Sequence, residues 1–113
     1  MPNLTELAHE HLTAALVDPH GRSAHLIAHD GELRQSIIAL RAGASLGEHN
    51  SPPAATLQVL QGQVRLLVGQ DVQGEFSAGE LSVLTHERHS VTAVTDAVFL
   101  LTTVTSVGTP AHG

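Results

Sequence analysis

The stretch LGEHNSPPAATLQVLQG, residues 46–62, decides how the chain is expected to fold. Its second half, TLQVLQ (56–61), alternates apolar and polar side chains, which is the pattern of a strand with one buried face. Gly62 separates this strand from QVRLLVG (63–69), so the sequence predicts a β-hairpin at this glycine. The first half carries one histidine, His49, on the approach to the strand.

Strand-like segments continue on both sides of this stretch at intervals of roughly 8 to 12 residues. Even spacing of short strands is typical of a sandwich or barrel, and about eight strands are expected in all. The polar segment GQDVQGEF (69–76) is expected to form a turn. The other predicted strands are SAHLIAH (23–29), LRQSIIALRAG (33–43), ELSVL (80–84), HSVTAV (89–94) and AVFLLTTV (97–104).

A short helix is expected before the strands. Asn3 and Glu6 have the spacing of a capping box, and apolar residues then recur at helical intervals. The segment DPHGR (18–22) ends it. The 113 residues are therefore interpreted as one all-β domain, with a helix over 3–17, a barrel over 23–105 and a loose tail over 106–113.

Composition excludes several classes of protein. Cysteine is absent, which excludes disulfides and zinc–thiolate sites. The five arginines are scattered, there is no lysine and the net charge is −6, so nucleic-acid binding is not expected. No apolar run approaches the roughly 18 residues of a membrane helix. The N-terminus lacks the basic and apolar regions of a signal peptide, so the expected location is the cytoplasm.

Two blocks of the sequence resemble the paired motifs of the cupin superfamily, the small jelly-roll barrels. The first block is EHNSPP…TLQVLQG, and the second is GEL…HSVTAVTDAVFLLT. The resemblance runs from about residue 34 to residue 104 and is greatest to small, single-domain conserved-barrel bacterial cupins. It implies an RmlC-like cupin jelly roll, and the helix before the barrel suits that group.

The resemblance also implies where a metal would be held. Metal-binding cupins use an HxH pair and a glutamate from the first motif and a third histidine from the second. In this chain His49 matches the first histidine and His89 the last, whereas Ser51 and Ala55 stand at the other two positions. Gln58 is a weak substitute, because its parity relative to Ala55 places it on the opposite face of the strand.

Three further side chains near the two motifs are candidate metal ligands: Glu48, His86 and Glu87. Glu48 is expected to face away from His49 if the segment is extended. Glu87 is expected in solvent, and His86, three residues before His89, is expected to lean over the barrel mouth as a third nitrogen ligand.

Arginines and the other histidines are weighed in the same way. Arg34 or Arg41 can bind a carboxylate if it projects into the barrel, but on an edge strand it is only solvated, and that second interpretation is preferred. His9 and His11 are expected to face solvent around the helix, and His20, His25 and His29 are expected at surface or strand-end positions. His112, in the tail, is expected to have no role.

The sequence thus predicts a cupin-type protein that binds a small organic molecule near His49, His86 and His89. A divalent transition metal (Zn, Ni, Fe, Mn or Cu), weakly held by His49 and His89, is one interpretation, and two hydrogen-bonded histidines without metal is the other. The alternative functions are a metal-dependent dioxygenase, isomerase or decarboxylase on a small acid, and a ligand-sensing dimer. A homodimer is expected through the outer faces of 23–29 and 33–43.

Overall fold

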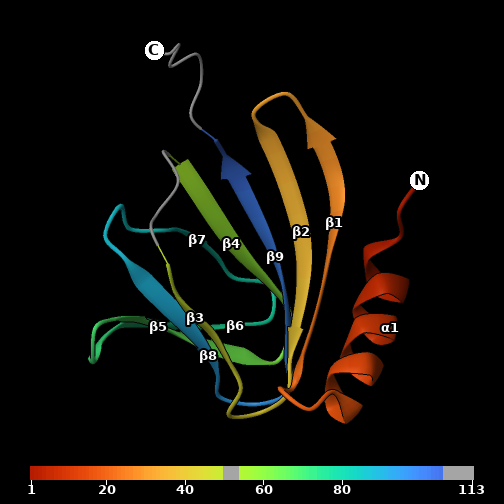
Figure 1. The fold of residues 1–113 in the computed structure, drawn as a ribbon, viewed down its shortest axis with the longest axis horizontal. Helices are drawn as coiled ribbons and strands as arrows, with labels where there is room; N and C mark the ends of the chain where they lie inside the picture. The colour runs from red at the N-terminus through yellow and green to blue at the C-terminus, as the bar shows by residue number, and fades with distance from the viewer. Residues whose placement is uncertain (50–53, 106–113) are drawn as a thin grey trace.

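The computed structural model describes residues 1–49 and 54–105 of the chain and, for residues 48 and 49, the backbone only. Two antiparallel sheets face each other, and a helix packs outside one of them (Figure 1). This is the all-β architecture with an N-terminal helix that the sequence predicts. The tail over 106–113 lies outside the described residues.

Several strands that are distant in sequence pair within each sheet, as in a jelly roll. The five-stranded sheet has the order β1 (Arg22–Asp30), β2 (Leu33–Leu40), β9 (Ala97–Val104), β4 (Ala54–Gln61) and β7 (Leu81–Val83). The four-stranded sheet has the order β3 (Ser45–His49), β8 (His89–Ala93), β5 (Gln63–Val68) and β6 (Asp71–Ser77).

The main core lies between the two sheets, and strand alternation selects its members. On β9, Phe99 faces the opposite sheet and is fully buried, whereas its neighbour Val98 faces the helix. The inter-sheet core consists of Ile38, Leu40, Ala55, Leu57, Val59, Val64, Leu66, Leu84, Val91, Ala93, Ala97 and Phe99.

Helix α1 (Leu4–Val17) is stabilised at both ends by polar groups. At its start, the Asn3 Oδ1 atom accepts a hydrogen bond from the Glu6 backbone N–H at 3.0 Å, so the predicted N-cap is confirmed. At its end, Arg41 Nη1 donates to the carbonyl oxygens of Leu16 and Asp18, at 3.4 and 3.1 Å. A cation at a helix C-terminus also complements the helix dipole.

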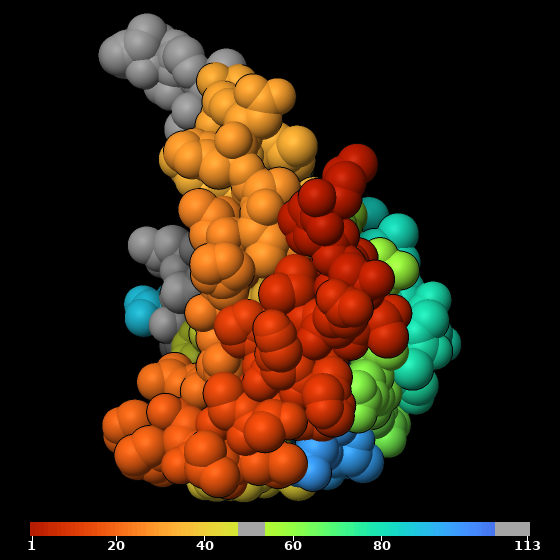
Figure 2. All heavy atoms as spheres, turned by 90° about the vertical axis from the view of Figure 1, so that its right-hand side faces the viewer, coloured from red at the N-terminus to blue at the C-terminus, as the bar shows by residue number. Residues whose placement is uncertain are grey.

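Helix α1 covers part of the outer face of the five-stranded sheet, and Figure 2 shows it lying beside β1. Ile37, Ala39 and Val98 are buried beneath it, against Ala8 and Ala15 of the helix. The prediction that the outer face of 33–43 contacts a second copy is therefore wrong at Ile37 and Ala39, because the chain's own helix already covers them.

Two strands and one turn differ from the sequence prediction. The segment predicted as a turn, 69–76, contains β6, which pairs with β5 along its length. Residues 45–49 form β3, which was not among the predicted strands. The predicted hairpin at Gly62 is wrong, because β4 pairs with β7 and β9 whereas β5 pairs with β6 and β8.

Gly62 instead carries the chain from one sheet to the other. Its φ of +80° is in the left-handed region that favours glycine. A Cβ atom there would overlap the backbone carbonyl oxygen of Asp96. The close approach of these two backbone segments joins the β4–β5 and β8–β9 connections at one end of the barrel.

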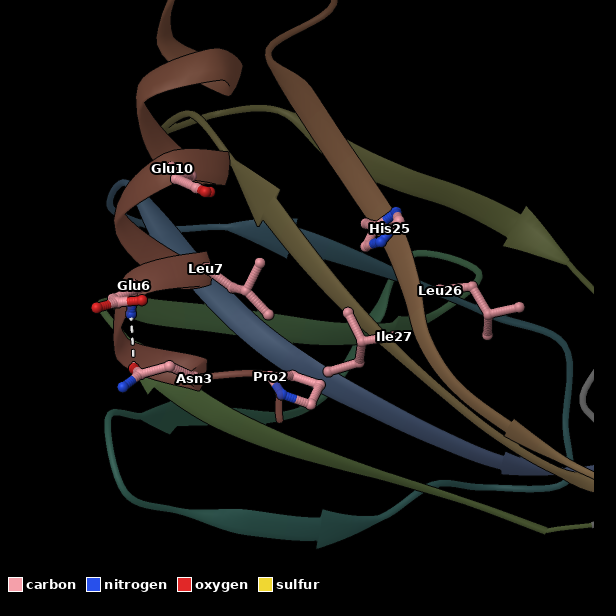
Figure 3. Close-up of a pocket in the computed structure, with 8 residues that line it drawn as sticks. All are labelled: Pro2, Asn3, Glu6, Leu7, Glu10, His25, Leu26 and Ile27. Atoms are coloured by element: carbon pink, nitrogen blue, oxygen red, sulfur yellow. Dashed lines mark hydrogen bonds between the residues drawn. The ribbon is translucent and has the colours of Figure 1, made fainter.

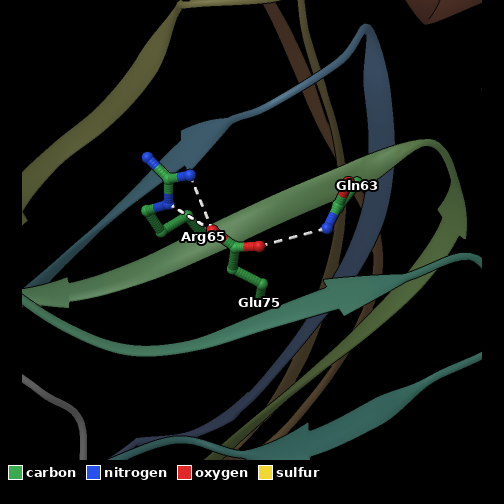
Figure 4. A network of polar contacts seen from close by, with 3 residues as sticks. All are labelled: Gln63, Arg65 and Glu75. Atoms are coloured by element: carbon green, nitrogen blue, oxygen red, sulfur yellow. Dashed lines mark hydrogen bonds and ion pairs between the residues drawn. The ribbon is translucent and has the colours of Figure 1, made fainter.

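An ion pair lies on the outer face of the four-stranded sheet (Figure 4). Glu75 accepts from Arg65 Nε at 2.7 Å and from Gln63 Nε2 at 3.3 Å, and Arg65 Nη2 lies 2.6 Å from the same carboxylate. Both charged side chains are exposed to solvent, and such pairs contribute about 1 kcal/mol or less. Within the described residues, no helix is long and apolar enough to cross a membrane.

Candidate site at the barrel mouth

One end of the barrel, at the top of Figure 1, is formed by the start of β2, the end of β9 and the start of β4. The register places Arg34 beside Thr103, and Thr103 beside Ala55. These three residues share the face of the sheet that carries Ile38, Leu57 and Phe99 into the core. On the five-stranded sheet, these residues lie between the inter-sheet core and the barrel mouth.

His89 is the buried polar residue of this region. It begins β8 and is 1% exposed, on the same face as the core residues Val91 and Ala93. Its Nδ1 atom lies 2.9 Å from the Glu87 carbonyl oxygen. A carbonyl oxygen only accepts, so Nδ1 carries the hydrogen of this bond.

His49, the other predicted metal ligand, lies opposite His89 in the backbone register of β3 and β8. A β-bulge between Leu46 and His49 precedes this pairing. The side chain of His49, and all of Ser51, lie outside the described residues. The two predicted histidines are therefore neighbours by strand pairing, and the contact between their rings stays a prediction.

Ala55 faces the core, on the side of β4 that the resemblance to the cupin motif implies. It is 7% exposed and packs in the inter-sheet core with Leu57 and Val59. Gln58 lies on the other face of β4, the face that carries Leu60 against the helix. The orientation of side chains along β4 is thus the one expected from sequence, and Gln58 faces away from the predicted metal site.

The loop before His89 is exposed to solvent. His86 and Glu87 are both exposed, and the Glu87 backbone N–H is bound by Thr85 Oγ1 at 3.1 Å. Glu87 is solvated, as expected. His86 is placed three residues from the buried His89, and its participation in a site stays a prediction.

Solved structures with the same arrangement of strands are known. A conserved protein of unknown function from Streptococcus pyogenes superposes with a TM-score of 0.69, at 21% identity over 80% of this chain and 79% of that chain. A cupin superfamily protein from Desulfitobacterium hafniense has a TM-score of 0.68, at 14% identity over 75% and 78% of the two chains. A cupin-2 domain protein from Shewanella frigidimarina has a TM-score of 0.66, at 14% identity over 92% and 94%. The protein has the cupin fold.

At these identities the likeness concerns the fold alone. No protein-family profile matches the chain, and no curated protein sequence is significantly similar to it. The function of this chain therefore depends on its own side chains and does not follow from the fold.

The residues at the mouth fit part of a cupin metal set. A metal-binding histidine usually donates its second ring N–H to an oxygen atom, and His89 makes such a bond to Glu87. Against this, the position of the motif's carboxylate is filled by the apolar Ala55. The described residues hold no group of three or more His, Cys, Asp or Glu side chains that could bind a metal ion. The described residues therefore fit the histidine part of that set and not its carboxylate.

The two arginines weighed from sequence have different roles. Arg41 binds the C-terminal carbonyls of α1 and is structural. Arg34 is on β2, which lies between β1 and β9, so the preferred interpretation of an edge-strand arginine is wrong. Arg34 is half-buried, and its Nη1 atom donates to Thr105 Oγ1 at 3.0 Å.

Two histidines outside the motifs are brought together by the packing of α1 on β1. The rings of His11 and His25 stack with centroids 5.8 Å apart, and His11 Nδ1 lies 2.7 Å from Ser23 Oγ. The expectation that His11 is a solvent-facing residue is wrong, because it is half-buried. The contact joins residues 11 and 25, which occupy separate elements, so no local sequence pattern indicates it.

A shallow cavity of about 250 Å³ lies beside this stack, between the N-terminal half of α1 and β1 (Figure 3). Leu7 and Ile27 point toward one another at its base, and Glu10 extends over it from the helix. This cavity is on the outside of the five-stranded sheet and is separate from the barrel mouth.

Proposed function

We propose that this cupin-fold protein binds a small organic molecule at the barrel mouth, beside His49, His86 and His89. The observation that supports it is the burial of His89, a polar ring placed at the end of an otherwise apolar inter-sheet core. Small barrels have interiors wide enough for side chains or one small ligand. A few polar groups at the edge of an apolar interior are typical of small-molecule sites.

The proposal includes a divalent transition metal (Zn, Ni, Fe, Mn or Cu), held weakly by His49 and His89. The fixed ring orientation of His89 and the pairing of the two backbones support it. The apolar Ala55 argues against a full ligand set and, with it, against the alternative of a metal-dependent dioxygenase, isomerase or decarboxylase. When bound, a metal would supply Lewis-acid chemistry at the mouth.

Elemental analysis of untagged protein, purified without chelator, tests the metal. The variant His49→Ala/His89→Ala is compared with His9→Ala/His20→Ala, which removes two exposed histidines. Metal well below one per chain that falls further only in the first variant supports weak binding, and metal equally low in every protein would leave a barrel that binds a small molecule without metal. Near-stoichiometric metal that is lost only from the first variant would contradict weak binding and favour the enzyme.

Nuclear magnetic resonance with ¹⁵N-labelled protein and a set of small organic fragments tests ligand binding. Shifts confined to the backbone amides of Ala55, His89 and Thr103 are expected. If fragments shift only the amides of Leu7 and Ile27, binding is in the cavity beside α1, and the proposed site is wrong.

The proposal also places the protein in the cytoplasm as a homodimer. Leu26 on the edge strand β1 is 45% exposed, and Leu33 at the start of β2 is 39% exposed. Unpaired edge strands favour association between copies. Light scattering after gel filtration is expected to give twice the chain mass, and Leu26→Glu is expected to yield monomer.

A further inference from the structure

Arg34 is a half-buried cation on the inner face of the five-stranded sheet. Side chains alternate along β2, and Ile38 and Leu40 on this strand belong to the inter-sheet core. Arg34 has the same parity as these two residues, so its side chain leaves the strand on the barrel side. It lies at the mouth, where its cross-strand neighbours are His29 and Thr103.

The guanidinium of Arg34 is not neutralised by the part of the chain that the structure describes. Its Nη1 atom donates to a neutral hydroxyl, Thr105 Oγ1, at 3.0 Å. The ion pair found in the described residues, Arg65–Glu75, is on the outer face of the other sheet. A partly desolvated charge is unfavourable unless an opposite charge or several hydrogen bonds compensate it.

The groups around Arg34 suit a carboxylate. A guanidinium offers parallel N–H donors that match the two oxygens of a carboxylate. Thr103 and Ser36 are half-buried hydroxyl residues on the same face. Leu101, paired with Ser36, packs against the core on this face and provides an apolar surface for a short carbon chain.

We propose that Arg34 anchors the carboxylate of a small organic acid bound at the barrel mouth. This inference rests on the proposed function, and it names the ligand class that the site selects. Thr105 holds the guanidinium in place through its hydroxyl, and is a positioning residue.

Sodium butanoate and its neutral isostere butanamide test the charge requirement. Both are titrated into ¹⁵N-labelled protein, and the amides of Arg34, Thr103 and His89 are followed. Butanoate is expected to bind with an affinity about tenfold higher than butanamide, because only the carboxylate accepts the charged pair of hydrogen bonds. Arg34→Gln is expected to reduce butanoate to the affinity of butanamide.

Two further variants keep the test decisive. Arg65→Gln removes an outer-face arginine of the other sheet and is expected to leave the butanoate affinity unchanged. Arg34→Lys keeps the charge and loses the paired donors, so it is expected to give an intermediate affinity even if Arg34→Gln fails to fold.

The outcomes separate this inference from the proposed function. Equal affinities for butanoate and butanamide at the mouth, or full butanoate affinity in either folded Arg34 variant, would overturn the role of Arg34 and leave the small-molecule site intact. No shift at the mouth from these probes or from any fragment would overturn both.

Discussion

His89 donates its Nδ1 hydrogen to the backbone carbonyl oxygen of Glu87, 2.9 Å away and two residues earlier in the chain. The ring is therefore oriented by its own loop before any ligand arrives. Because the ring is also 1% exposed, its packing contributes to the fold as well as to the site.

Replacing His89 with alanine is expected to destabilise the protein by about 2 to 4 kcal/mol, because a buried ring and a hydrogen bond are both lost. His86→Ala removes an exposed ring from the same loop and is expected to change the free energy of unfolding by about 0.5 kcal/mol or less. Urea unfolding measures both. Equal effects of the two variants would contradict the buried position of His89.

The substitution Ala55→Glu places a carboxylate on the inner face of β4, at the position that the cupin motif gives to glutamate. Without metal, the variant should be destabilised by about 2 kcal/mol or more, because a charge is placed in an apolar core. Added zinc is expected to raise its melting temperature more than that of the wild type. Ala54→Glu, on the exposed neighbouring position, is the matched control. An identical response to zinc in the two variants would refute the inward orientation of position 55 relative to the histidines.

Gly62→Ala is expected to destabilise the fold by about 3 kcal/mol or more, since the new Cβ would collide with backbone. It would overlap the Asp96 carbonyl oxygen and lie 2.9 Å from Ala97 Cα. Gly43→Ala has a comparable φ of +86° but open space around the added carbon, so about 1 to 2 kcal/mol is expected. Denaturant titration of both variants separates the collision from the backbone strain, and similar losses would argue against the close approach.

Asp18 is expected to contribute to the free energy of unfolding at neutral pH and to lose this contribution in acid. Backbone hydrogen bonds from Arg22 and then from His20 hold the pKa of this carboxyl below its ordinary value of 3.8. A carboxyl group whose pKa is lowered by folding stabilises the folded state above 3.8, and this contribution is lost as the pH falls below that value. Asp18→Asn should therefore be less stable than the wild type at neutral pH, and the difference should shrink in acid.

Urea midpoints between about pH 7 and pH 3 measure this difference. Asp71→Asn, in an exposed position at the start of β6, corrects for the removal of one negative charge. A difference between Asp18→Asn and the wild type that stays constant down to the lowest pH would show that folding does not change the pKa of Asp18.

The local features of this protein follow from its sequence. Asn3 caps α1 because its side chain reaches the backbone N–H of Glu6, three residues away. Alternation along β4 places Ala55 and Gln58 on opposite faces without reference to any other strand. Both relations depend on a few consecutive residues, so pattern alone is sufficient to predict them.

Relations between distant residues required the tertiary structure. The alternation of side chains predicts which of them share a face of a strand, but it does not predict which strand lies alongside. For this reason the pairing of β6 with β5 and the crossover at Gly62 were not predicted. The contact of Arg41 with the end of α1 was likewise not predicted, because the two are far apart in sequence. Nor was the internal position of Arg34, which depends on β2 lying between β1 and β9. The sequence by itself determined the fold class and the N-terminal helix, and its resemblance to cupins implied the missing carboxylate at Ala55. Only the tertiary structure decided which charges face the barrel, because that depends on long-range strand order.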